Sequence, residues 1–170
     1  QIVLVGKMEA SVYRAGNKAF KVYDGFMAHI LDLQTIYKYY DLTERTMEVV
    51  RANPDIEKEF GYEIKIIPIE KVGKLRAKTH ICTISSFVSC RNIEQIWSEM
   101  PQEDKTVLMG KFDRLNKRLQ MSLGCQNVRI DMVNAKFDEA GKSVFVTDVC
   151  GEISRLNPSF IDQPTVFYLG

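Results

Sequence analysis

The chain carries the sequence RIDMVNAKFDEAGKSVFVTD from Arg129 to Asp148. The alternation of polar and apolar residues in its second half predicts a small hairpin, with strands at 135–137 and 143–146. The segment 138–141 holds an aspartate and a glycine, which favour a turn between the two strands. A further short strand is expected around 129–130. This stretch therefore predicts a compact β-structure in the second half of the chain.

Polar side chains flank this hairpin on both sides. Asp131 and Asn134 precede its first strand, and Asp148 follows its second strand. Carboxylate and amide oxygens are hard ligands that suit Mg²⁺ bound together with phosphates. Turn formation is the alternative explanation, because Asp and Asn both favour turns. The order of the three residues along the chain favours a metal site.

Three short strands are predicted at the beginning of the chain, over residues 2–5, 11–14 and 18–23. Gly16 and Asn17 separate the last two strands, and both residue types tolerate the positive φ of a tight turn. Lys21 stands in the middle of the third strand, where a lysine must find a partner or extend its amine to water. A lysine on an exposed edge strand is the alternative.

Helical spacing follows these strands, in the apolar residues Phe26, Ile30, Leu33 and Tyr37. Asp41 followed three residues later by Glu44 has the pattern of a capping box, which predicts that a second helix opens there. This helix is expected to stop before Pro54, because proline breaks the pattern. Glu44 is the expected partner of Lys21, and Glu48, one turn later, is its competitor.

Two more strands are predicted at 62–69 and 78–88, joined by a basic loop over 71–78. They complete a five-stranded antiparallel sheet with one helical segment after its third strand. Helices are expected next at 92–97 and 104–123. The longer helix carries an apolar stripe and ends at a glycine, as helices often do: Leu108, Phe112, Leu115, Leu119 and Gly124. The last twenty residues have the composition of an extended tail.

The composition excludes several classes of protein. The 170 residues carry a net charge of +1, which argues against a strongly basic nucleic-acid surface. No apolar run approaches the roughly 20 residues that span a bilayer, and no signal peptide opens the chain. It begins with Gln1, so we expect that a leader could have been removed. The four cysteines form no C-x-x-C pair, which favours reduced, packed thiols over a zinc site or a disulfide framework.

Taken in order, these motifs resemble those of protein kinases. Gly6, Val12 and Lys21 resemble the glycine loop, valine and lysine that open a kinase, and Glu44 resembles its helix glutamate. Residues 83–94 look like the last strand, the hinge and the first helix of the second lobe. Arg129-Ile-Asp131 with Asn134 resembles the catalytic loop H-R-D…N. Thr147-Asp-Val-Cys-Gly151 resembles the metal-binding D-F-G.

The resemblance implies an α+β, protein-kinase-like fold with an ATP-binding N-lobe over 1–88 and a much reduced C-lobe over 89–170. It also implies ATP and Mg²⁺ as cofactors. Lys21 would hold the α- and β-phosphates, and Glu44 would hold Lys21. Gly6, Val12, Phe87 and Val88 would line the nucleotide site. Asn134 and Asp148 would bind the metal, while Asp131 would orient the substrate hydroxyl and accept its proton.

The chain departs from the family pattern in several places. Met8 stands where a second glycine is expected, and the histidine and arginine before the catalytic aspartate are absent. The catalytic loop is two residues shorter than usual, so that Arg129 would occupy the base position by strict spacing. We expect Asp131 to be the base. No A-P-E motif and no large helical lobe follow.

The small size resembles the minimal kinases that bacteria deliver into host cells by type III secretion, most of all the HopBF family. That resemblance implies a bacterial virulence effector located in the host cytoplasm. It implies a monomer that phosphorylates a serine of the eukaryotic ninety-kilodalton heat-shock chaperone, with no nucleic-acid or membrane partner. Four alternatives remain: a non-catalytic kinase-like binding module, an effector kinase of host ubiquitin signalling, a small-molecule kinase, and an α+β domain with no active site. A small-molecule kinase would need a large helical lobe. An α+β domain with no active site would need the five polar residues to follow the kinase order by chance.

Overall fold

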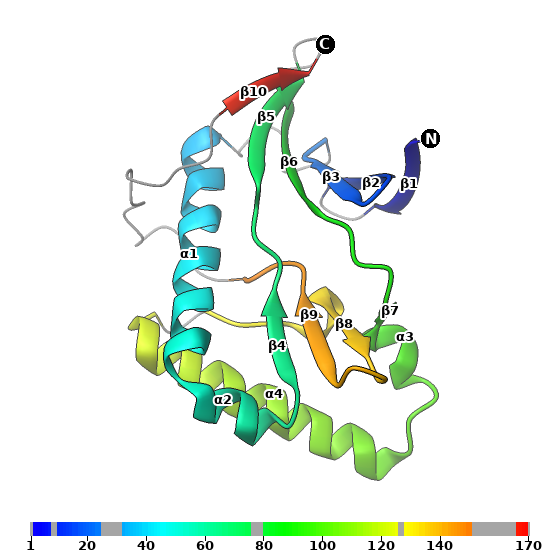
Figure 1. Cartoon of the computed structure of the whole chain (residues 1–170), viewed down its shortest axis with the longest axis vertical. Helices are drawn as coiled ribbons and strands as arrows, with labels where there is room; N and C mark the ends of the chain where they lie inside the picture. Colours follow the sequence, from blue (N-terminus) through cyan, green and yellow to red (C-terminus); the bar gives the residue numbers. More distant parts are fainter. Residues whose placement is uncertain are drawn as a thin grey trace. The chain divides into compact units, whose positions relative to one another are not determined.

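The computed structural model describes residues 2–7, 10–24, 32–75, 80–125, 128–150 and 166–169. These residues form an α+β protein that divides into two compact units (Figure 1). The first unit comprises Gln1–Asp41, Pro68–Val88 and Asn157–Gly170, and the second comprises Leu42–Ile67 and Ser89–Leu156. The change of unit after Val88 coincides with the predicted lobe boundary. The segment 42–67, predicted in the first lobe, belongs to the second unit.

The described strands of the first unit form one sheet in the order β1-β2-β3-β6-β5-β10. The antiparallel part holds β1 (Ile2–Lys7), β2 (Ser11–Ala15), β3 (Lys18–Val22), β6 (His80–Ser86) and β5 (Lys71–Leu75), and β10 (Val166–Leu169) adds a parallel strand beside β5. Gly16 closes the β2–β3 turn with a φ of +62°, as its sequence predicts. Strand β10 lies where the sequence predicts an extended tail.

Strand β5 corrects a prediction. The basic loop expected over 71–78 contains β5, which pairs with β6 from Lys71 to Leu75. The two lysines of β5 suggested a loop, but Val72 is fully buried and the backbone pairs on both sides, with β6 and β10. Tertiary pairing therefore overrides the polar composition of this short strand.

The strand predicted at 62–69 is shorter than expected and belongs to the other unit. Strand β4 (Glu63–Ile66) alternates exposed Glu63 and Lys65 with buried Ile64 and Ile66. It pairs in parallel with β9 (Ser143–Val146), which forms a hairpin with β8 (Ala135–Asp138). Strand β7 (Arg91–Asn92) completes the sheet order β4-β9-β8-β7. The alternating pattern identified a half-buried strand, but it carries no information about which sheet the strand joins.

Helix α1 (Leu33–Ala52) corrects the predicted capping box. It runs without interruption through Asp41 and Glu44, because no glycine or proline breaks the helix there. The helix is capped instead by Asp32, whose Oδ1 accepts hydrogen bonds from the Thr35 amide and hydroxyl, both at 2.8 Å. The end before Pro54 is confirmed. Phe26 and Ile30 of the predicted helix lie outside the described residues.

The second unit is built around the long helix α4 (Gln102–Leu123), and Figure 1 shows α2 (Pro54–Phe60) lying along it. The predicted apolar stripe is confirmed, since Leu108, Phe112, Leu115 and Leu119 are all buried in the core of this unit. The helix ends at Gly124 in the left-handed conformation, as predicted. The Phe112 ring meets Phe60 of α2 edge-on, with centroids 5.2 Å apart.

Helix α3 and the β8–β9 turn of the second unit both form where the sequence predicts them. Helix α3 (Ile93–Trp97) begins with a capping box in which Asn92 Oδ1 accepts from the Glu94 amide at 2.8 Å. The β8–β9 turn is confirmed, since Asp138 Oδ1 accepts from the Gly141 amide at 3.1 Å. The helices that the structure describes are all too short or too polar to span a bilayer.

Candidate active site

One turn of 3-10 helix, Met132–Asn134, joins two of the predicted site residues in the second unit. Asp131 precedes this turn in an extended conformation, with φ −86° and ψ 145°. The Asn134 amide donates to the Asp131 carbonyl at 3.0 Å, which closes the turn. The shortened loop therefore places Asp131 and Asn134 at opposite ends of one turn.

The strand that returns from the hairpin brings Asp148 to the same region. Arg129 and Cys150 form an antiparallel bridge, in which each amide donates to the other's carbonyl at 2.8 and 2.9 Å. Thr147 donates to the Asn134 carbonyl through its amide at 2.8 Å and through its hydroxyl at 3.1 Å. Asp148 is half-buried between these two attachments. The backbone thus ties the Asp148 segment to the turn that holds Asn134.

The thiol of Cys150 lies among the predicted site residues. Asn134 donates to it through Nδ2 at 3.5 Å, and the Asp131 carboxylate lies beside the thiol. Burial, followed by the negative charges of Asp131 and Asp148, raises the pKa of Cys150 to about 11, and the positive charge of Arg129 opposes this shift. The structure therefore brings Asp131, Asn134 and Asp148 together around one neutral thiol.

Arg129 forms an ion pair with Asp131, from its Nε to the carboxylate oxygens at 3.2 Å. The two side chains are 61% and 34% exposed, so water screens the pair and its contribution to stability is small. Arg129 is the residue expected at the base position by strict spacing, and the carboxylate that it pairs with is that of Asp131, the expected base. Arg129 and Asp131 both lie just before the 3-10 turn Met132–Asn134.

Two polar residues of α4 hold the segment before Asp131, where the strand expected around 129–130 is reduced to one isolated β-bridge at Arg129. Sequence reasoning does not identify these two residues. Asn116 accepts from the Ile130 amide through Oδ1 at 2.7 Å and donates to the Ile130 carbonyl through Nδ2 at 3.2 Å. Gln120 donates to the Val128 carbonyl at 3.0 Å. Their spacing of four residues beside the apolar stripe was the available signal.

The predicted nucleotide residues of the first unit lie on its sheet. Gly6 pairs with Val12, and Val12 pairs with Lys21, so these three residues form one row across β1, β2 and β3. Side chains directly opposite one another share a face of the sheet, which puts Val12 and Lys21 on the same face. The Lys21 amine also lies 5.3 Å from the centroid of the Tyr23 ring.

The predicted adenine contacts follow β6. The Phe87 amide donates to the Asn17 carbonyl at 2.8 Å, and the Phe87 ring lies 4.3 Å from the Arg14 guanidinium carbon. This amide is therefore engaged by the β2–β3 turn, and an adenine contact at Phe87 would have to use its carbonyl. Val88 is half-buried and ends this segment of the unit.

Glu44 is half-buried on α1, and it belongs to the second unit, whereas Lys21 belongs to the first. The pairing of these two side chains stays a prediction. Asp131, Asn134 and Asp148 also belong to the second unit. The nucleotide candidates, including the catalytic candidate Lys21, belong to the first unit. Met8 of the expected phosphate loop and Gly151 of the Asp-Val-Cys-Gly motif lie outside the described residues.

The residues that could hold a divalent cation are Asn134 and Asp148. Asn134 uses its Nδ2 toward Cys150, while its Oδ1 accepts no hydrogen bond from the described residues. The oxygen is therefore available as a hard ligand. Within the described ranges, no three His, Cys, Asp or Glu side chains form a metal-binding group by themselves. An ion here would therefore need oxygens from a bound phosphate, as in many Mg²⁺ sites.

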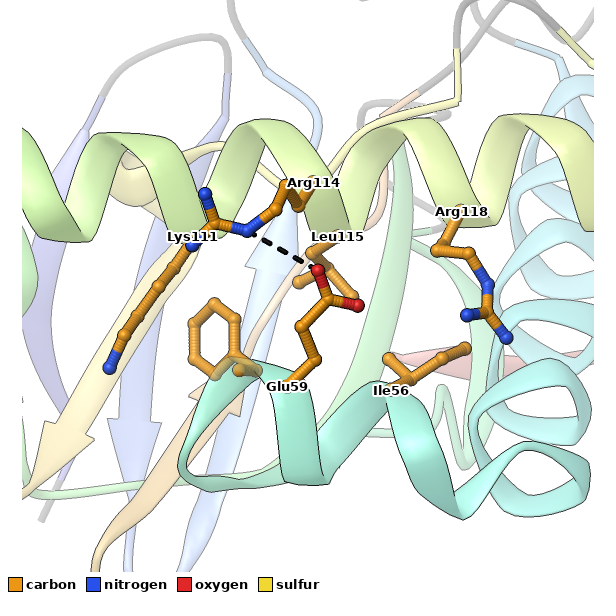
Figure 2. A pocket seen from close by; sticks show the side chains of 7 residues that line it. Ile56, Glu59, Lys111, Arg114, Leu115 and Arg118 are labelled. Atoms are coloured by element: carbon orange, nitrogen blue, oxygen red, sulfur yellow. Dashed lines mark ion pairs between the residues drawn. The ribbon is translucent and has the colours of Figure 1, made fainter.

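A hollow between α2 and α4 is lined by none of the predicted site residues (Figure 2). Figure 2 shows Glu59 of α2 facing Arg114 of α4, with their closest charged atoms 3.3 Å apart. Arg118 pairs with Asp55 at 2.7 Å on the same side of these helices. The side chains of both pairs are largely exposed, so water screens them and their contribution to stability is small.

Comparison with known proteins gives no assignment: no family model matches the chain, and no curated protein matches it significantly.

Proposed function

We propose that this chain is a reduced protein kinase that transfers the γ-phosphate of ATP to a serine or threonine of another protein. The observation that carries the proposal is the convergence of Asp131, Asn134 and Asp148 around Cys150, at the base of the β8–β9 hairpin. These residues come from segments on both sides of the hairpin. A carboxylate, an amide oxygen and a second carboxylate are the groups that phosphoryl transfer requires.

Each of the three residues has a distinct task in this mechanism. Asp148 and Asn134 would hold Mg²⁺ together with the ATP phosphates, and the ion would supply positive charge for the transferred group. Asp131 orients the hydroxyl of the substrate and accepts its proton. The ion pair with Arg129, at 3.2 Å, helps to orient the Asp131 carboxylate.

The first unit supplies the nucleotide contacts in this proposal. Lys21 holds the α- and β-phosphates, and Val12, which is opposite it on the same face, packs against the adenine side of the nucleotide. Gly6 begins the loop that covers the phosphates, and Glu44 orients Lys21. The Phe87 carbonyl and the backbone of Val88 contact the adenine. The kinase-like fold is part of the proposal, supported by the antiparallel sheet followed by the helices and hairpin of the second unit.

The finer proposal concerns where the protein acts. The reduced size and the resemblance to the HopBF family support a bacterial effector, delivered into the host cytoplasm. Its substrate would be a host protein, by resemblance a serine of the ninety-kilodalton heat-shock chaperone. An effector of host ubiquitin signalling would differ in its substrate and keep the same site.

A second candidate function is a non-catalytic module that binds nucleotide without transferring phosphate. The engaged Asp131 favours it, because the carboxylate already accepts from Arg129 and contacts the Cys150 thiol. A carboxylate that its neighbours already hold is less able to accept a proton from a substrate. Nucleotide binding without transfer would support this candidate.

The test is transfer of labelled phosphate from Mg-ATP, with the purified chain alone, with the purified chaperone and with a eukaryotic lysate. Asp148→Asn removes the proposed metal ligand, and Asp113→Asn on the exposed face of α4 is the matched control. We expect labelling by the wild type and by the control variant. The expected loss for Asp148→Asn is on the order of a hundredfold. Equal labelling by all three proteins, or no labelling by any, would contradict the proposal.

A further inference from the structure

We propose that Cys150 is a positioning residue of this site, whose thiol holds Asp131 and Asn134 at a fixed spacing for phosphoryl transfer. This inference rests on the proposed function. The Cys150 side chain reaches both ends of one 3-10 turn: it accepts from Asn134 Nδ2 at 3.5 Å and lies beside the Asp131 carboxylate. A thiol suits both contacts, because sulfur accepts weakly and S–H donates weakly.

The backbone around Cys150 makes this contact persistent. The paired hydrogen bonds with Arg129, at 2.8 and 2.9 Å, fix the Cys150 main chain beside the strand that leads into Asp131. The bonds from Thr147 to the Asn134 carbonyl fix the other end of the same segment. The thiol therefore belongs to a segment that is anchored by backbone hydrogen bonds at Thr147 and at Cys150.

The short proposed catalytic loop is held by few hydrogen bonds, so a side-chain contact from the thiol can restrain it. Asp131 and Asn134 stand three residues apart, so one hydrogen bond of 3.0 Å closes the whole turn between them. A single 3-10 hydrogen bond has poorer geometry than an α-helical one and holds a short turn weakly. A side chain that contacts both ends limits how far the proposed base and the proposed metal ligand can separate. Asn116 braces the preceding strand at Ile130, and it does not reach across the turn in this way.

The test compares Cys150→Ala, which removes both contacts, with Cys150→Ser, which keeps a donor and an acceptor. Cys125→Ala is the matched control, since Cys125 is another half-buried thiol of the same unit. We expect kcat to fall about tenfold in Cys150→Ala, with a smaller change in KM for Mg-ATP. Cys150→Ser is expected to recover most of the rate. If Cys150 contributes only packing, both alanine variants should have a lower melting temperature. Neither variant should then show a fall in kcat that exceeds its change in KM.

A second readout does not depend on activity. The side-chain amide of Asn134 gives its own signals in ¹⁵N-correlated NMR spectra of the full chain, and we expect them to shift in Cys150→Ala and not in Cys125→Ala. Unchanged transfer in Cys150→Ala, or unchanged Asn134 signals, overturns the inference while leaving the kinase proposal intact. If the wild type transfers no phosphate, the proposed function is overturned, and the positioning role in transfer falls with it; the Asn134 signals then decide only whether the contact exists.

Discussion

At the scale of single residues, polar side chains fix the ends of helices and turns in this protein. The sequence identified Asp138 at its hairpin turn and Gly124 at its helix end, because both act through their immediate neighbours. It misplaced the cap of α1, since Asp41 and Glu44 have the spacing of a capping box but lie inside the helix. Asp32, the residue that does cap the helix, lies at the end of a stretch with no such signature.

Replacing Asp32 by alanine is expected to lower the free energy of unfolding by about 1 kcal/mol, because the Thr35 amide loses its acceptor. Hydrogen bonds from the Thr35 amide and then from its hydroxyl lower the pKa of Asp32 from 3.8. A lowered pKa stabilises the fold above the ordinary value, and this contribution is lost as the pH falls. Urea unfolding at several pH values should therefore show a difference that shrinks below pH 3.8.

Gln34→Ala, at an exposed position in the first turn of the same helix, is the control for this cap. It should leave the urea midpoint almost unchanged. A cost for Asp32→Ala that stays constant down to strongly acid pH would contradict the role of the charged carboxylate.

Cys150 is the site residue that sequence reasoning missed. Asp131, Asn134 and Asp148 could be proposed because carboxylates and amides carry recognisable chemistry at strand ends. For Cys150 the sequence predicts only a reduced, packed thiol. Its position between Asp131 and Asn134 follows from the Arg129–Cys150 bridge, which pairs residues on opposite sides of the hairpin. No pattern in the sequence reports such a pairing.

At the scale of helices and strands, periodicity predicted what each element is, but not always which partner it takes. The stripe of α4 is confirmed because four buried residues at helical spacing leave little freedom in its orientation. Strand β4 shows the limit of this reasoning. Its alternation is clear, yet it pairs with β9 in the second unit, and β5 takes the expected place beside β6. Pairing depends on residues that are distant in the sequence.

Gly110 within α4 and Gly124 at its end test how the helix is stabilised, because their substitution by alanine should have opposite effects on stability. Gly110 lies within the helix, and an added Cβ would meet only the end of the Arg114 side chain, at 3.3 Å. Gly110→Ala should stabilise the protein by about 0.5–1 kcal/mol, since glycine is a poor helix former. Gly124 has a φ of +63°, so Gly124→Ala should destabilise by about 1 kcal/mol.

Thermal and urea unfolding of these two variants measure both effects. The wild type and the two variants differ only by methyl groups at the middle and the end of one helix. Destabilisation by Gly110→Ala would mean that the Arg114 side chain cannot move aside. A neutral Gly124→Ala would mean that the left-handed residue is not needed to end α4.

At the scale of the whole molecule, the chain divides into units that do not follow its linear order. The second unit takes α2 and β4 from the segment 42–67 and the remainder from Ser89 onward. Its core joins Ile56, Phe60 and Ile64 from the first segment to Phe112 and Leu115 from the second. The predicted division into 1–88 and 89–170 therefore cuts through one hydrophobic core.

A fragment of residues 89–170 is expected not to unfold cooperatively, because it lacks the residues that cover one side of α4. Adding a peptide of residues 42–67 should restore a cooperative transition, as measured by circular dichroism during urea titration. A peptide with Ile56 and Phe60 replaced by serine is the control and should fail to do so. A sharp transition in the fragment alone would contradict this division of the molecule.

The central claim is that Lys21 of the first unit and Asp148 of the second act in one phosphoryl-transfer reaction. The most direct measurement is the rate of phosphate transfer from Mg-ATP by Lys21→Met, Asp148→Asn and the double variant. Lys18→Met is the control on the same strand, since Lys18 pairs with Glu70 at 2.5 Å. We predict that each single site variant loses on the order of a hundredfold in rate and that the double variant is hardly worse, because groups that act together are not additive. Transfer at the wild-type rate by either single variant would contradict the claim.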